Sequence, residues 1–209
     1  MSRRSGSRSR LPRVPLVSVT MVPAMALVLA VVLAGCGTAT PVASFDPASA
    51  CTTDGRMPGA YPDLEALLPT AYEDKAPATV DSGRNCTPAA LGTLAVAGID
   101  GVRFAGATWP LGGTSGLTVA VFEGDGLDPK AMIDFYEAGA RTASRTEKLL
   151  TADATVAGQP ARRLAVLRSD GSGQTILAWP DGENRVMVLL AADVGDTAVA
   201  EAAEGFANP

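Results

Sequence analysis

The first 34 residues constrain this chain most, because their pattern is that of a leader and not of a folded domain. Residues 1–14 hold five arginines and no acidic residue, and residues 15–34 are apolar apart from one serine and one threonine. A positively charged start followed by an apolar run is typical of a secretory signal peptide. The alternative is a transmembrane helix, which needs about 20 apolar residues. Pro23 interrupts the run and leaves residues 24–34, a length typical of signal peptides, so the sequence predicts an exported protein.

The apolar run ends in Leu33-Ala34-Gly35-Cys36. This tetrapeptide resembles the lipobox of bacterial lipoproteins, in which the cysteine is linked to diacylglycerol and becomes the mature N-terminus after cleavage. The resemblance implies that residues 1–35 are a lipoprotein signal peptide and that Cys36 is the lipidation site. It also implies that the protein is lipid-anchored at the extracytoplasmic face of a bacterial membrane. Residues 36–50 are small, contain proline and lack periodicity, so we expect a flexible tether to a single domain at residues 51–209.

The chain has three cysteines, an odd number that needs an explanation in an exported protein. With Cys36 assigned to lipid, Cys51 and Cys86 remain as an even pair in an oxidising compartment. A redox or metal-binding pair is the alternative, but the pair has no C-x-x-C spacing. We predict a structural disulfide between Cys51 and Cys86, which in the chain-entropy model contributes on the order of 3–4 kcal/mol.

The charge balance excludes one class of partner. Five of the 17 basic residues and none of the 22 acidic residues lie in the leader, which leaves a formal charge of −10 on the rest of the chain. Nucleic acids and anionic lipid surfaces bind basic patches. We therefore expect no nucleic-acid partner, and we expect contact with the membrane only through the lipid.

Helix-start signals recur along the domain. We expect helices that begin at Asp63, Thr87-Pro88, Asp128-Pro129 and Asp196. A capping residue followed by proline favours a helix start. The second helix is expected to continue to Gly98, where glycine favours a helix end, and the last to about Phe206. The third helix has an apolar stripe of Met132, Phe135 and Tyr136.

Between the helices lie five strand-like runs, separated by turns that contain glycine, aspartate or proline. They are VRFAGATW, LTVAVFE, ARRLAVLR, QTILAW and RVMVLLAA, and residues 149–157 form a possible sixth. The sequence therefore predicts an α+β domain in which an antiparallel sheet of five or six strands carries helices on one face. Trp109-Pro110 and Trp179-Pro180 end two of these runs in a similar way, which indicates either an internal repeat or two hairpins with similar turns.

Catalysis is not expected, because the chain contains no histidine. This excludes Ser-His and Cys-His nucleophile pairs and the commonest zinc ligand. Paired carboxylates can cleave glycosides, but no spacing singles out a pair. Asp125 and Asp128 flank a glycine, yet the ligand series of a calcium-binding EF-hand is missing. We therefore expect neither an enzyme nor a bound metal or cofactor.

Two non-enzymatic functions remain. The first is a binding or adaptor module for another envelope protein or a cell-wall polymer, with contact residues of the types that dominate interfaces: Trp109, Trp179, Tyr61, Tyr72, Arg162, Arg163 and Arg168. A tryptophan at a strand end also commonly packs at the edge of a core. Because neighbouring residues of a strand point to opposite faces, Arg162 and Arg168 share a face that excludes Arg163. The second function is that of a carrier, with a small apolar or amphipathic ligand in a cavity between sheet and helices.

The order of tether, disulfide-linked α+β domain, antiparallel hairpins and amphipathic helix is similar to that of small secreted lipoproteins of high-GC bacteria. Some of these have an α/β sandwich like that of the PsbP and Mog1 proteins. The similarity lies in the overall pattern of residues 100–206 and implies a non-catalytic accessory role, but it assigns no role to any residue.

Overall fold

A computed structural model describes residues 45–208, which form one domain. The predicted signal peptide, Cys36 and most of the expected tether lie outside these residues. Within the described residues, no helix is both long and apolar enough to cross a membrane.

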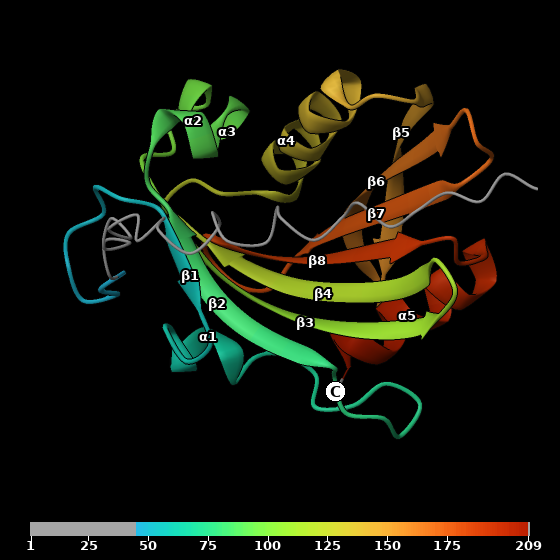
Figure 1. Ribbon diagram of the computed structural model, residues 1–209, viewed down its shortest axis with the longest axis horizontal. Helices are drawn as coiled ribbons and strands as arrows, with labels where there is room; N and C mark the ends of the chain where they lie inside the picture. Colours follow the sequence, from blue (N-terminus) through green and yellow to red (C-terminus); the bar gives the residue numbers. More distant parts are fainter. Residues whose placement is uncertain (1–44, 209) are drawn as a thin grey trace, which may run out of the picture. The chain divides into compact units, whose positions relative to one another are not determined.

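The domain is built on one antiparallel sheet (Figure 1). Its strands are β1 (Gly55–Met57), β2 (Thr79–Asn85), β3 (Val102–Gly112), β4 (Ser115–Glu123), β5 (Thr146–Val156), β6 (Gln159–Arg168), β7 (Gly173–Pro180) and β8 (Arg185–Ala192). The helices are α1 (Pro62–Glu65), α2 (Pro88–Leu91), α3 (Thr93–Val96), α4 (Pro129–Thr142) and α5 (Asp196–Ala207). The strand order β1-β2-β3-β4-β8-β7-β6-β5 describes two meanders of four strands that join where β4 pairs with β8.

The α+β class is confirmed, but the sheet has eight strands where the sequence predicted five or six. The five strand-like runs and the possible sixth are β3 to β8. The two strands that the sequence did not predict are β1 and β2, because β2 directs Ser82 and Arg84 inward in place of apolar side chains. Gly83 between them allows close strand packing, since a Cβ atom there would lie 2.3 Å from the carbonyl oxygen of Gly55.

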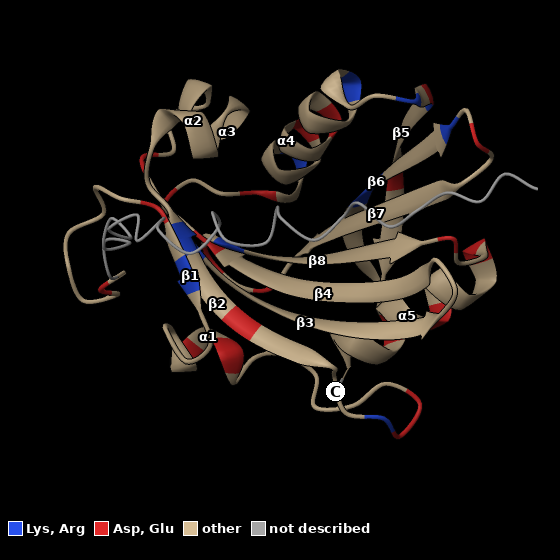
Figure 2. Cartoon of the chain, in the orientation of Figure 1, with Lys and Arg blue, Asp and Glu red and all other residues tan. Residues whose placement is uncertain are grey.

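Helices cover both faces of the sheet, so the prediction of one covered face is wrong. In β4, Leu117, Val119 and Val121 pack into a core with α1 and α5. The alternate residues Ala120 and Phe122 pack into a second core with α2, α3 and α4, and Figure 1 shows the two helix groups on opposite sides of the sheet. Strands β4 and β8 carry charge only at one shared end (Figure 2), so they are apolar on both faces and need cover on both.

The helix-start predictions have mixed outcomes. Asp128 caps α4 by accepting a hydrogen bond from the backbone N–H of Ala131 at 2.7 Å. Thr87 caps α2 in the same way, but Gly92, at φ +52°, splits the predicted helix into α2 and α3. Asp196 is the first helical residue of α5 and its side chain caps nothing; it pairs instead with Arg163 of β6.

The similarity between the two Trp-Pro segments is limited to their hairpins. The β3–β4 and β7–β8 hairpins join through β4 and β8, and Trp109 and Trp179 face the same side of the sheet. The helices that follow the hairpins pack on opposite faces, α4 on one and α5 on the other.

Candidate functional site

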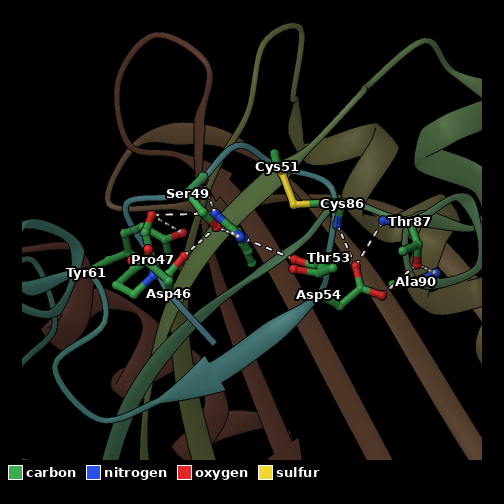
Figure 3. Close-up of a disulfide and its surroundings, with 11 residues drawn as sticks. Asp46, Pro47, Ser49, Cys51, Thr53, Asp54, Tyr61, Cys86, Thr87 and Ala90 are labelled. Atoms are coloured by element: carbon green, nitrogen blue, oxygen red, sulfur yellow. Dashed lines mark hydrogen bonds between the residues drawn. A yellow bond between two sulfur atoms is a disulfide. The ribbon is translucent and has the colours of Figure 1, made fainter. Parts of the chain in front are cut away.

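The disulfide predicted between Cys51 and Cys86 is present, and it fastens the segment before β1 to the end of β2 (Figure 3). Beside it, Asp54 accepts hydrogen bonds from the backbone N–H of Cys86 at 2.6 Å and from the N–H and hydroxyl of Thr87 at 2.9 and 2.6 Å. The hydroxyl of Thr87, followed by the N–H of Cys86, holds the pKa of Asp54 below its usual value. The start of α2 is therefore held both by the disulfide at Cys86 and by the hydrogen bonds to Asp54.

Arg84 of β2 is buried next to this disulfide and holds residues 45–53 against the domain. Its guanidinium donates to the carbonyl oxygens of Ser49 and Thr53 at 2.6 and 3.1 Å and to the Ser49 hydroxyl at 2.8 Å. It also lies 5.1 Å from the ring centroid of Phe45, in a cation–π contact. These acceptors are uncharged. Residues 45–50, the last part of the expected tether, thus contact the domain.

The two tryptophans proposed from sequence as contact residues lie in the interior. Trp109 and Trp179 are each 2% exposed, in the core with α1 and α5. The indole N–H of Trp109 donates to the carbonyl oxygen of Lys75 at 2.9 Å, and its ring stacks on Phe206. Neither indole contributes to the outer surface, because α5 and the chain around Lys75 fold over the ends of these strands.

The tyrosines also pack inward. Tyr61 is buried, with Arg103 over its ring, and Tyr72 packs against the ring of Phe206. These two tyrosines and two tryptophans therefore form no exposed aromatic cluster, the feature that would have supported the adaptor hypothesis.

The three arginines of β6 divide between the faces as predicted. Arg162 and Arg168 share the α4 side with Leu164 and Val166, whereas Arg163 faces α5. Arg162 pairs with Asp153 and Arg163 with Asp196. Arg168 has no ion pair within the part of the chain that the structure describes.

A groove lies between α4 and the sheet, and it is the strongest candidate for a functional site. It has a volume of about 500 Å³. We call it the α4 groove; its apolar walls are Phe135, Tyr136, Ala140 and Ala143 on the helix side and Val166, Ile176 and Leu190 on the strands.

The sequence of α4 explains why the groove exists. Met132 and Ile133, in the first half of the helix, are fully buried against the sheet. In the second half, Gly139, Ala140 and Ala143 are too small to fill the space that the helix spans. The groove is therefore a consequence of large side chains at one end of the helix and small ones at the other.

The polar residues that line the α4 groove are Thr93, Tyr136, Thr142, Thr146, Arg168 and Gln174. Arg168 is the only charged residue among those that line it. The hydroxyl oxygen of Thr93 is buried and has no hydrogen-bond partner among the described residues. Burial raises the pKa of the Tyr136 hydroxyl above its usual value, so this side chain stays neutral. An apolar channel with one cation and a few neutral hydroxyls can bind a molecule that has both apolar and polar parts.

A second hollow, of about 560 Å³, lies on the other face near the ends of β6 and β7. Charges of both signs line it, among them Lys148 and Asp193 and the paired Arg163 and Asp196. Such a polar surface is less suited to an amphipathic ligand than the α4 groove. Within residues 45–208, no three side chains of the metal-binding types come together.

Sequence reasoning named Arg168 but not the remainder of the groove. Phe135 and Tyr136 belong to the apolar stripe expected on the third helix, and the sequence does not assign that stripe to the cavity of the carrier hypothesis. The signal that was available is the run of small residues at 138–140, AGA, which leaves the second half of the stripe without bulk. Comparison with protein families, with curated proteins and with solved structures finds no match to this chain.

Proposed function

We propose that this protein is a lipid-anchored extracytoplasmic binding protein that holds a small amphipathic molecule in the α4 groove. The observation that carries this proposal is the groove itself. Its volume of about 500 Å³ lies within the range of about 300–1,000 Å³ that is typical of small-molecule sites. Its walls are mainly apolar, which is the composition expected of such sites.

The location follows from the leader and the disulfide. The resemblance of residues 33–36 to a lipobox supports a lipid anchor at Cys36, and the disulfide is typical of proteins in oxidising compartments. Because Arg84 holds residues 45–53 against the domain, only residues 37–44 separate it from the anchor. Eight extended residues reach at most about 30 Å. The groove would thus stay close to the membrane, where amphipathic molecules accumulate.

The lining of the groove supports binding without catalysis. Its residues include no carboxylate, thiol or imidazole, and the chain has no histidine. These are the groups that most often act as general bases and nucleophiles.

The test is to fill the groove. In Ala140→Trp, the indole occupies the space between α4 and β7, and we expect the dissociation constant for the neutral dye Nile red to rise at least tenfold, measured by fluorescence titration. Ala89→Trp places the same side chain on an exposed position of α2 and serves as the control. The proposal fails if folded Ala140→Trp, checked by circular dichroism, binds the dye as tightly as the wild type.

A second candidate function, adaptor for an envelope protein, is favoured by strand β5. This 11-residue strand is the last in the sheet, and most of it is exposed. Leu150 and Leu167, 55% and 43% exposed, lie on the same face of β5 and β6. An extended segment of a partner with apolar side chains can pair with such an edge, and Glu147, Lys148 and Asp153 limit self-association of the strand.

Crosslinking in intact cells separates this candidate from the first. A specific partner should be captured by wild type and by Ala140→Trp, and lost in Leu150→Glu with Leu167→Glu, because the charges are placed where the partner's apolar side chains would pack. Capture that persists in the double variant, or none above background in the wild type, rules out an adaptor that uses this edge.

A further inference from the structure

We infer that the α4 groove takes an anionic, single-chain amphiphile with a carboxylate head, held by Arg168 at one end and reaching Thr93 at the other. This inference rests on the proposed function, because it specifies the ligand of the same site.

The two polar residues mark opposite ends of the groove. Thr93 lines the groove and follows Gly92, where an added Cβ atom would lie 3.7 Å from the ring of Phe135. Arg168 pairs in register with Thr146, whose hydroxyl donates to the carbonyl oxygen of Ala140. From Phe135 to Ala140 the helix rises about 7.5 Å. The apolar walls fill the distance between the two ends, which suits an extended chain.

Arg168 supplies the charge preference. It is the only charged residue that lines the groove and has no ion pair among residues 45–208. Asp170 and Asp193 are near enough for the charge of Arg168 to help lower their pKa values, but their direct partners are other groups: Asp170 accepts from Ser172 and pairs with Arg145, and Asp193 accepts from Thr114 and Gly173. A guanidinium forms two parallel hydrogen bonds with a carboxylate and keeps its charge at every physiological pH. Because Arg168 is exposed at the end of β6, the head group would remain in contact with water.

Thr93 supplies the second contact. A buried hydroxyl without a partner destabilises the folded protein, and a ligand atom that pairs with it removes that penalty. A chain with an oxygen atom near its far end would therefore bind more tightly than the same chain without one.

Three probes with ten-carbon chains test the inference: decanoate, decyltrimethylammonium and 10-hydroxydecanoate, each below its micellar concentration and measured by displacement of Nile red. In the wild type, decanoate should bind at least tenfold more tightly than the cation. Arg168→Gln should raise the dissociation constant of decanoate at least tenfold and leave that of the cation unchanged. Arg168→Lys should bind decanoate with an affinity between those of Arg168→Gln and the wild type. Arg56→Gln, which removes an exposed arginine of β1 outside the groove, is the matched control.

The outcomes distinguish the two levels of the proposal. Equal binding of anion and cation by the wild type, or unchanged decanoate binding in Arg168→Gln, overturns the assigned ligand class. Neither result contradicts the proposal that the groove binds a small amphipathic molecule. Binding of Nile red by folded Ala140→Trp as tight as that by the wild type overturns the groove itself. A tighter wild-type affinity for 10-hydroxydecanoate than for decanoate, absent in Thr93→Val, supports the second contact, and equal affinities in the wild type refute it.

Discussion

Trp179→Ala is expected to lower the free energy of unfolding by about 3–5 kcal/mol, the usual range for truncation of a buried tryptophan. Trp179 is 2% exposed and is the largest fully buried side chain of the described residues. It lies on β7 opposite Met187 of β8, within the core that α1 and α5 cover. Removing the indole leaves a cavity between the sheet and the helices on this face, which the rigid sheet cannot close.

Urea denaturation followed by circular dichroism measures this effect. Trp179→Phe keeps an aromatic ring and should cost clearly less than the alanine variant. A stability of Trp179→Ala within 1 kcal/mol of the wild type would contradict the packing described here. Because Trp179→Ala destabilises the fold, loss of a crosslinked partner in this variant would result from unfolding. The variant is therefore unsuitable for mapping an interface.

Loss of the disulfide has the second largest expected effect. Cys51→Ala with Cys86→Ala should lower the free energy of unfolding by about 3–4 kcal/mol, because the bond restricts the unfolded chain. Without it, the segment of residues 45–53 is held chiefly by Arg84, so it should also be cut faster by proteases. Denaturant titration and limited proteolysis measure the two effects.

Reduction of the wild type by dithiothreitol provides the control, since it removes the same bond without changing a side chain. It should shift the unfolding midpoint to that of the double variant. A double variant as stable as the oxidised wild type would show that Arg84 and its hydrogen bonds fix the segment without help from the bond.

Much of the fold could be predicted because its signals are local. The strands β3 to β8 have apolar runs bounded by turn residues, and the Asp128-Pro129 pair marked the start of α4. Strand β2 could not be predicted, because its inward positions hold Ser82 and Arg84, whose partners are more than ten residues away in sequence. Strand β1 has only three residues and no buried side chain, so it leaves no apolar pattern. The apolar residues on both faces of β4 and β8 were a signal in the sequence that helices cover both faces of the sheet.

The candidate site could be predicted only in part. Whether a strand-end tryptophan is inside or outside depends on which distant segments cover it, here α5 and the carbonyl of Lys75. The groove likewise depends on how far α4 stands from strands that follow it in sequence. A cavity lining has no sequence pattern of its own, and small residues such as Ala140 indicate one only when the opposing wall is known. Lipidation at Cys36 and the similarity to PsbP and Mog1 proteins stay predictions.

The position of β8 in the sheet has a consequence for the order in which the chain folds. It lies between β4 and β7, although every other strand precedes it in sequence. Thr118 pairs with Leu190, and contacts over so long a loop form slowly. Because a chain is synthesised from its N-terminus, β4 is made before β8 and is until then the unpaired edge of the first meander. It keeps an apolar edge until β8 arrives, and during this interval the growing domain is exposed to association with other chains.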